Sequence, residues 1–226
     1  MQGNGILITV RYLKKRHYDW STSIAYIVGL MASDGCLQSD GRHLDITSVD
    51  TDQLENFNQG IGRIMRISEK SNSSAVTAYR IQFSDVAFYD FLLQVGLTPN
   101  KSKTLGKLNI PTEYYAPFLR GLFDGDGSCY GYYDPRWPTS FVYYVSFSSA
   151  SPAFLDFIST ANRQIIGVKG NSIRNRAHSM SLVYGKADSY LLYKSIYKHS
   201  EGLFLNRKRS KWEGFINIDG NAIIPD

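Results

Sequence analysis

Two aspartates, Asp34 and Asp126, end two similar stretches of the sequence and could do chemistry together. Residues 25–35 read AYIVGLMASDG and residues 117–127 read PFLRGLFDGDG, at a constant offset of 92 residues. Each aspartate stands directly before a glycine suited to end a helix. A carboxylate there faces the negative end of the helix dipole, and two such groups brought together repel each other. A divalent cation relieves both effects, and hard oxygen ligands suit Mg²⁺. A single acid would more simply cap its helix or face solvent, so it is the pair that favours a metal site.

Small residues recur four apart in both stretches. They are Ala25, Gly29 and Ser33 in the first and Pro117, Gly121 and Gly125 in the second. On a helix such residues share one face, so a second helix can approach until the backbones nearly touch. A helical glycine costs about 1 kcal/mol relative to alanine, and we expect close packing of the two helices to offset that cost. The spacing therefore predicts a helix pair with the two aspartates at its ends.

These stretches resemble the signature helices of the LAGLIDADG homing endonucleases, in the single-chain form that contains two copies. GLFDGDG is a close match and IVGLMASDG a looser one. In the looser copy Ala32 stands where the signature has its first acid, which Asp124 keeps in the second copy. Arg120 replaces a usually small residue. Neither departure removes Asp34 or Asp126, so we expect the protein to be competent for cleavage.

The order of predicted elements repeats with the signature and indicates an α/β (α+β) fold of two pseudo-symmetric αββαββα repeats. Besides the first signature helix, the first repeat is expected to have helices at 51–65 and 86–95, and strands at 36–39, 43–49, 66–70 and 75–84. Besides the second signature helix, the second is expected to have helices at 148–165 and 187–198, and strands at 128–133, 140–148, 168–173 and 179–184. We therefore divide the chain into an N-terminal extension, 1–20, a first half-domain, 21–110, and a second half-domain, 111–226.

The extension has no counterpart before the second signature. It contains a strand-like run at 5–12 and then a basic segment. It could be an extra strand, an arm along DNA, or a read-through from a host gene.

If the signature helices pack, each repeat places a four-stranded antiparallel sheet on one side of a common axis, and the two sheets form a saddle. Such a saddle could follow successive major grooves of double-stranded DNA over about twenty base pairs. Outward polar residues of the strands are then candidate contacts to bases and phosphates. In the first half they are Gln38, Arg42, His43, Asp45, Thr47, Lys70, Arg80 and Gln82. In the second they are Arg136, Trp137, Tyr143, Arg174, Arg176, His178 and Ser181. The lysines Lys103 and Lys211 are further candidates for DNA contact. Trp137 could instead be a packing residue.

The resemblance also implies a mechanism. Asp34 and Asp126 would each serve one DNA strand, with the carbonyls of Ser33 and Gly125 as further metal ligands, leaving a double-strand break with short 3′ overhangs. The metal would be Mg²⁺ or Mn²⁺, with Ca²⁺ as a non-productive substitute. The family also has a basic residue in each catalytic pocket, for which Lys101 fits in the first half. Lys208 is our choice in the second half, with Lys211 as the alternative.

Composition agrees with a folded protein that binds a polyanion. The chain has 25 Lys and Arg against 20 Asp and Glu, a net charge of +5, and is 43% hydrophobic. It shows no signal-peptide pattern and no apolar run long enough for a membrane span. Two cysteines, Cys36 and Cys129, are too few for a disulfide framework. We expect a soluble, intracellular monomer encoded by an intron or intein, in a bacterial or archaeal cytoplasm or an organelle, that needs no protein partner. Two alternatives stay open: a maturase that binds intron RNA, and a DNA-binding protein without cleavage activity.

Overall fold

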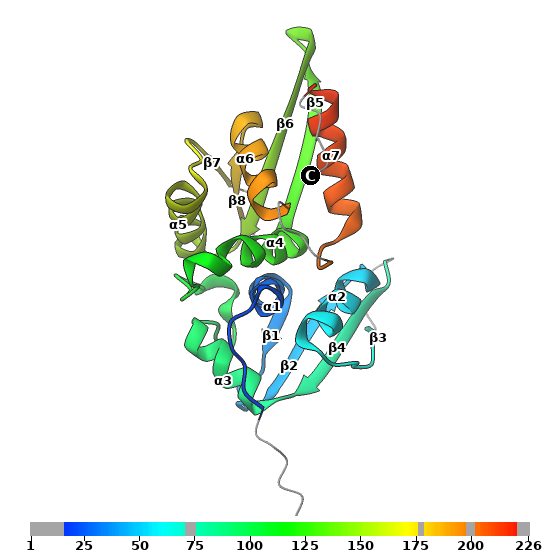
Figure 1. Cartoon of the computed structure of the whole chain (residues 1–226), viewed down its shortest axis with the longest axis vertical. Coiled ribbons are helices and arrows are strands. Elements are labelled where there is room, and N and C mark those ends of the chain that lie inside the picture. The colour runs from blue at the N-terminus through cyan, green and yellow to red at the C-terminus, as the bar shows by residue number, and fades with distance from the viewer. Residues whose placement is uncertain (1–15, 71–75, 176–178, 198–201, 221–226) are drawn as a thin grey trace, which may run out of the picture.

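The computed structural model describes residues 16–70, 76–175, 179–197 and 202–220, which form two halves of the same architecture (Figure 1). The first half consists of α1 (Thr22–Ser33), β1 (Gly35–Leu37), β2 (His43–Ser48), α2 (Thr51–Ile61), β3 (Ser68–Lys70), β4 (Ala78–Ser84) and α3 (Val86–Val95). The second half consists of α4 (Tyr115–Asp126), β5 (Gly127–Asp134), β6 (Trp137–Ser149), α5 (Pro152–Ala161), β7 (Ser172–Asn175), β8 (Met180–Tyr184), α6 (Lys186–Tyr197) and α7 (Asn206–Ile218). The expected αββαββα order is confirmed in both halves.

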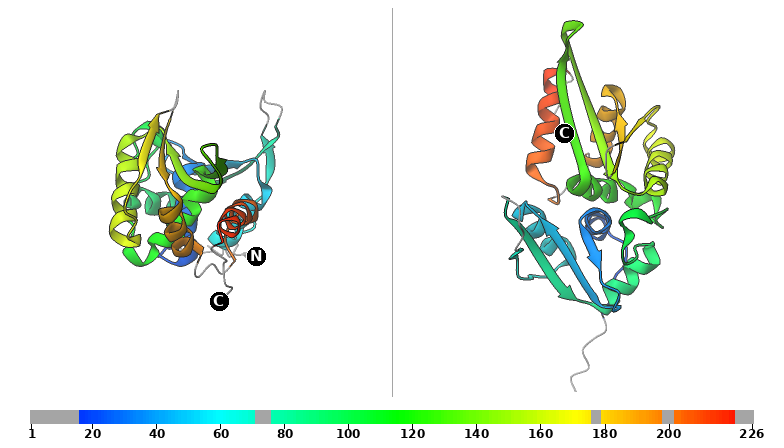
Figure 2. Two further views of the ribbon diagram at one scale, coloured as in Figure 1. Left: turned by 90° about the horizontal axis from the view of Figure 1, so that it is seen from above. Right: turned by 180° about the vertical axis from the view of Figure 1, so that it is seen from behind.

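Each half contains one four-stranded antiparallel sheet, in the order β1-β2-β4-β3 or β5-β6-β8-β7. The registers correspond, because Gly35 pairs with Ile46 in the first sheet and Gly127 with Phe147 in the second. Helices lie against one face of each sheet, and Figure 2 (right) shows the molecule from the opposite side. Along β2 and β4, buried apolar residues that face the helices alternate with polar residues that face the open side, as a half-buried sheet requires.

Helices α1 and α4 lie against each other at the centre of the molecule, with one sheet on either side (Figure 1). Two glycines make this close approach possible. A Cβ atom added at Gly29 would overlap Phe118 O, and one added at Gly121 would overlap Tyr26 O. The backbones of the two helices therefore touch, as the four-residue spacing of small residues predicts. The hydrophobic core is continuous through this helix pair into both halves.

Local signals fix most helix ends. Ser21, Asp85 and Ser151 each accept a backbone N–H in the first turn of α1, α3 and α5, the usual N-cap arrangement. Helix α2 was expected to reach residue 65, but it ends at Ile61 because Gly62 takes a left-handed conformation with φ of 68°. Ile64, which was expected on the apolar stripe of that helix, is consequently exposed.

The remaining boundaries differ by a few residues from those expected. Strand β6 begins at Trp137 rather than 140, because Pro135 and Arg136 alone form the turn. Helix α5 begins at Pro152 and gives way to a π-helical turn, Asn162–Ile166. The short 3₁₀ turns Lys101–Lys103 and Thr112–Tyr114 lie in the connection between the halves.

Helix α7 was not expected. The basic run 206–211 opens a helix of 13 residues, whereas the basic residues Lys101–Lys103 form a single 3₁₀ turn. The signal was present in the sequence, since Lys208, Trp212 and Ile216 are spaced by four and all three are buried. The helix packs beside β5, and its start reaches α2 of the first half (Figure 1), where Asn56 Nδ2 donates to Phe204 O at 2.9 Å.

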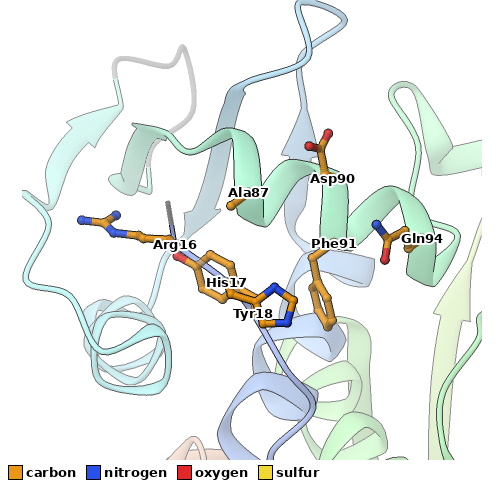
Figure 3. Close-up of a pocket in the computed structure, with 7 residues that line it drawn as sticks. All are labelled: Arg16, His17, Tyr18, Ala87, Asp90, Phe91 and Gln94. Carbon is orange, nitrogen blue, oxygen red and sulfur yellow. The ribbon is translucent and has the colours of Figure 1, made fainter. Parts of the chain in front are cut away.

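The described part of the extension, residues 16–20, packs on the helical side of the first half. The Tyr18 ring contacts Phe88 and Phe91 of α3. The Tyr18 hydroxyl donates to Asp85 Oδ2 at 3.0 Å, and the same oxygen accepts a hydrogen bond from Arg16. A shallow pocket lies there, lined by Arg16, His17, Tyr18, Ala87, Asp90, Phe91 and Gln94 (Figure 3). These five residues of the extension thus lie away from the open sheet faces, and the strand-like run 5–12 lies outside the described residues.

No helix in the described part of the chain is long and apolar enough to cross a membrane.

Candidate active site between the two halves

The last turns of α1 and α4 bring Asp34 and Asp126 together. Asp34 is the C-cap residue of α1, and Asp126 is the final residue of α4. A Cβ atom added at Gly125 would lie 2.8 Å from Asp34 Oδ2. The carboxylate of Asp34 therefore reaches the residue directly before Asp126, so the convergence follows from the same close packing that Gly29 and Gly121 permit.

Both carboxylates are held in an environment that disfavours their charge. Burial raises the pKa of Asp34 to about 6, and the nearby charge of Asp126 contributes to that rise. Solvent reaches Asp126, yet the protein packed around it still raises its pKa through desolvation. Two acids destabilised in this way, partly by each other, would gain free energy from a cation between them.

One buried lysine lies under each helix end. Lys101 Nζ donates to Gly35 O at 2.5 Å, and Lys208 Nζ donates to Gly127 O at 2.8 Å. Gly35 and Gly127 are equivalent residues, so the two lysines are placed alike. Burial lowers the pKa of both, that of Lys208 to about 8. Both ammonium groups also exert an electrostatic effect on Asp34 and Asp126 that favours the ionised carboxylates.

Lys208 makes two contacts that Lys101 does not match. Its Nζ also donates to Phe123 O at 2.9 Å and to Gly125 O at 2.7 Å, so all three of its N–H groups are used. It therefore caps the C-terminal end of α4, where a cation is favourable. Lys211, the alternative for this place, is exposed and lies over the Phe215 ring.

A pocket of about 260 Å³ opens beside Asp34, lined by Asp34, Thr47, Ser48, Val49, Asp50, Gln53, Ala78, Asp124, Gly125 and Arg207. Gln53 Nε2 donates to Asp34 Oδ2 at 2.6 Å and is itself buried. The guanidinium of Arg207 pairs with Asp50 through two hydrogen bonds, one of them 2.7 Å from Nε to Oδ1. Sequence reasoning missed Gln53 and Arg207, because only the tertiary fold brings them to the acid.

The two acids have different surroundings. Counting from the N-cap residues Asp50 and Ser151, Phe154 of α5 is the counterpart of Gln53 in α2. Phenylalanine cannot donate a hydrogen bond, and no described side chain donates one to Asp126. The first acid is thus held in position by an amide, whereas the second is held by its backbone alone.

Asp124, the first acid of the better signature, has a positioning role. Its Oδ2 accepts from Tyr26 Oη at 2.7 Å across the helix pair and from Leu205 N at 2.8 Å. Leu205 directly precedes α7, so Asp124 fixes the start of the helix that carries Lys208. Arg120 is buried nearby and donates to Leu203 O and Ile196 O. The retained acid Asp124 and the departure Arg120 therefore both anchor the C-terminal segment.

The acid pair fits a hard divalent cation. Among the described residues no group of three or more His, Cys, Asp or Glu side chains could hold a metal. A metal here would have to complete its coordination with backbone carbonyls, water and substrate phosphate. Mg²⁺ binds in this way, through one or two carboxylates and retained water. The donors present suit Mg²⁺ better than Zn²⁺, for which nitrogen and sulfur ligands are usual.

The strand residues expected to face outward mostly do so. In the first half, Cys36, Asp45 and Gln82 lie side by side across the sheet, as do Thr47 and Arg80. His43 and Lys70 share this open face, and Arg42 lies in the turn before β2. Gln38 donates to Asp45 at 3.2 Å and Lys70 to Thr47 at 3.3 Å.

In the second half two expectations were wrong. Tyr143 is fully buried against Phe215, because it shares the inward parity of Val145 and Phe147 on β6, and its neighbour Tyr144 takes the outward position. Ser181 has outward parity on β8 but is buried, with its hydroxyl 3.1 Å from that of Ser148. Among the other candidates, Arg174 is exposed on β7, and Arg136 and Trp137 are exposed near the β5–β6 turn. Arg176 and His178 lie outside the described residues, and Lys103 is exposed beside Lys101.

Metal-free protein is expected to lose thermal stability as the pH rises from about 5 to 7. Burial raises the pKa of Asp34 and Asp124 to about 6, so in this range the folded protein binds more protons than the unfolded chain, and the free energy of unfolding falls with rising pH. The measurement is the Tm in EDTA across this range. Added Ca²⁺ should reduce the decline by binding the ionised pair, and a Tm that rises without metal would contradict the assignment.

The fold of this chain is shared with known proteins. Residues 113–197 match the family of LAGLIDADG-like domains. No curated protein sequence matches the chain. The homing endonuclease I-WcaI bound to its DNA recognition sequence is similar in structure, with a TM-score of 0.59 and 13% identity over 85% of this chain and 88% of that one. I-AabMI bound to uncleaved DNA gives a TM-score of 0.60 and 11% identity over 87% and 90%.

Full-length DUF199/WhiA from Thermatoga maritima is also similar, with a TM-score of 0.59 and 13% identity. The match covers 91% of this chain, which spans 62% of the length of WhiA. The same fold therefore occurs both in homing endonucleases and in WhiA, so the fold alone does not identify the activity of this chain. The chain therefore has the fold of the LAGLIDADG homing endonucleases, with two repeats in a single chain, and its residues 113–197 match the LAGLIDADG-like domain family.

Proposed function

We propose that this protein is a metal-dependent, site-specific DNA endonuclease of the homing type. The observation that carries the proposal is the meeting of Asp34 and Asp126 at the ends of two touching helices, between two open sheet faces. Two acids that repel each other would be stabilised by a bound cation, which cleavage requires and DNA binding alone does not. The proposal includes one cut in each strand of a long asymmetric site, short 3′ overhangs, and action as an intracellular monomer.

Each residue of the site has a role in this proposal. Asp34 and Asp126, with the carbonyls of Ser33 and Gly125, would hold Mg²⁺ or Mn²⁺. Such an ion lowers the pKa of bound water and stabilises the leaving oxygen of a phosphodiester. Lys101 and Lys208 keep the carboxylates ionised and supply positive charge near the scissile phosphates.

Arg207 adds a second positive group on the side of Asp34. Its pairing with Asp50 fixes the guanidinium at the pocket, where its positive charge would attract a phosphate. Because Asp126 lacks an equivalent of Gln53, we propose that the two strands are cut at different rates.

A double-stranded DNA partner of about twenty base pairs is supported by the two open sheets and by the structural neighbours, several of which are described as bound to DNA. An intron-encoded origin and action on intron RNA are implied only by the resemblance to the LAGLIDADG homing endonucleases. A non-cleaving DNA-binding protein is the second candidate, because the same fold occurs in WhiA, which is not described as an endonuclease. Retention of both acids favours the nuclease.

The proposal is tested with a randomised duplex library in Mg²⁺, followed by sequencing of the cleaved ends, with Asp34→Asn protein in parallel. We expect one long asymmetric site, cut by the wild type only. Enrichment of a DNA site without cleavage would replace the proposal by the binding protein. If neither is found, binding to a structured intron RNA would support the maturase instead.

A further inference from the structure

The two open sheet faces differ in chemistry although their strands are equivalent. On the first face, the outward residues are mainly charged groups and amides: Gln38, His43, Asp45, Lys70, Arg80 and Gln82. On the second, the described residues of outward parity that reach the surface are Ser128, Tyr130, Tyr132, Val142, Tyr144, Ser148, Ser172 and Arg174, while Ser146, Ser181 and Val183 are buried beneath their neighbours. The positions of Gln38 and His43 are taken by Tyr130 and Tyr144, which pair directly across β5 and β6.

The three outward tyrosines form a stacked ladder, defined here as Tyr130, Tyr132 and Tyr144. Tyr144 stacks on Tyr130 with ring centroids 5.3 Å apart and on Tyr132 with centroids 6.2 Å apart. The Arg174 guanidinium lies 5.4 Å from the Tyr144 centroid, and its Nη1 donates to Tyr130 Oη at 2.7 Å. The ladder is therefore a preorganised aromatic surface on the open face of the second sheet.

Both described arginines near the ladder are already engaged. Arg136 makes two hydrogen bonds to Asp134 through its side chain, and Arg174 is held over the rings. Neither is free to make the bidentate contact to guanine that arginine makes in a major groove. Base stacking needs an open ring face, and the central ring of the ladder, Tyr144, is stacked against both Tyr130 and Tyr132.

The ring carbons of the ladder offer apolar contact in the major groove, in addition to any hydrogen bonds from the tyrosine and serine hydroxyls. The one apolar group that base pairs present there is the 5-methyl of thymine. We infer that the tyrosine ladder reads thymine methyl groups, so that the half-site under the second sheet is thymine-dependent while the half-site under the first is read by hydrogen bonds. This inference rests on the proposed DNA partner and does not require cleavage.

Deoxyuridine provides the test, because it differs from thymidine only by the missing methyl group and pairs in the same way. Wild-type protein is assayed for binding without Mg²⁺ to its selected duplex, with thymines replaced in one half-site at a time. Cys36 is exposed on the first face and Cys129 is buried, so an iron chelate on Cys36 cleaves DNA under the first sheet and identifies the half-sites. We expect about a fourfold loss of affinity per contacted methyl in the second half-site, and less than twofold in the first.

Two variants locate the effect on the ladder. Tyr132 is 47% exposed at the end of the stack, so Tyr132→Ser should fold normally and reduce the deoxyuridine effect. Tyr144→Phe keeps the ring and should retain it, which separates ring contact from hydroxyl bonding. Equal losses in both half-sites, no loss in either, or an unchanged effect in Tyr132→Ser would overturn the inference. Methyl-independent binding with intact cleavage would leave the proposed nuclease in place.

Discussion

Replacing Asp34 or Asp126 by asparagine is expected to abolish double-strand cleavage and to leave DNA affinity within a few-fold of the wild type. The amide keeps the shape of the side chain but removes the charge that would hold a divalent ion. Loss of metal-assisted activation of water and of the leaving group is worth several kcal/mol, so we expect a decrease of at least about 10³-fold. Binding should survive, because the open sheet faces are untouched and one repulsive charge is gone.

The measurement compares cleavage in Mg²⁺ and binding in Ca²⁺ on the same duplex. Asp90→Asn is the matched control, since Asp90 lies on α3 in the pocket of Figure 3, away from the acid pair. It should cleave at the wild-type rate. Double-strand cleavage that persists in either site variant would remove the mechanism proposed here, whereas loss of binding in both would show that the substitutions had damaged the fold.

Gly121→Ala is expected to destabilise the protein even though alanine is the better helix former. Its Cβ atom would overlap Tyr26 O and lie 2.9 Å from Tyr26 C, and both are backbone atoms that no rotamer change can move. Helices α1 and α4 would have to separate, at an overpacking cost of about 1–3 kcal/mol or more, which outweighs a helix-propensity gain of about 1 kcal/mol. Gly29→Ala should behave alike, with its Cβ atom 2.6 Å from Leu122 N.

Urea unfolding measures this effect, and Gly214→Ala is the matched control. Gly214 lies inside α7 with nothing within 4 Å of an added Cβ atom, so its replacement should raise the free energy of unfolding. The helix-pair variants should also cleave more slowly than their stability alone explains, because the acids move apart. An unchanged or raised stability in Gly121→Ala would mean that the helices are not in backbone contact.

The sequence was informative wherever a short pattern determined the structure. The spacing of Gly29 and Gly121 predicted the central helix pair, and the repeat predicted both sheets. Tyr143 was placed wrongly although strand alternation contained the answer, since it shares the parity of buried Val145 and Phe147. Helix α7 was missed because its basic residues were read as a motif, while the buried stripe through Trp212 was not counted.

Other features could not be obtained from sequence. The contact of Gln53 with Asp34 joins residues 19 apart, and that of Arg207 with Asp50 joins residues 157 apart. No periodicity links such positions; they depend on how α2 and α7 pack around the helix pair. The same holds for the role of Asp124, whose partner Tyr26 lies 98 residues away.

The contact between Tyr26 and Asp124 also makes the two halves selective for each other. Phe118 is the equivalent of Tyr26, and Ala32 is the equivalent of Asp124; both are buried and apolar. The helix pair therefore contains one polar pair of positions, Tyr26 and Asp124, and one apolar pair, Phe118 and Ala32. Two copies of α1 would bury tyrosine hydroxyls without an acceptor, and two copies of α4 would bury carboxylates beside phenylalanine. A buried polar group without a partner costs about 1–3 kcal/mol, and a charged one more. Duplicated halves that differ in this way associate as unlike partners, so the asymmetry that the proposed non-palindromic target would require is built into the central helix pair.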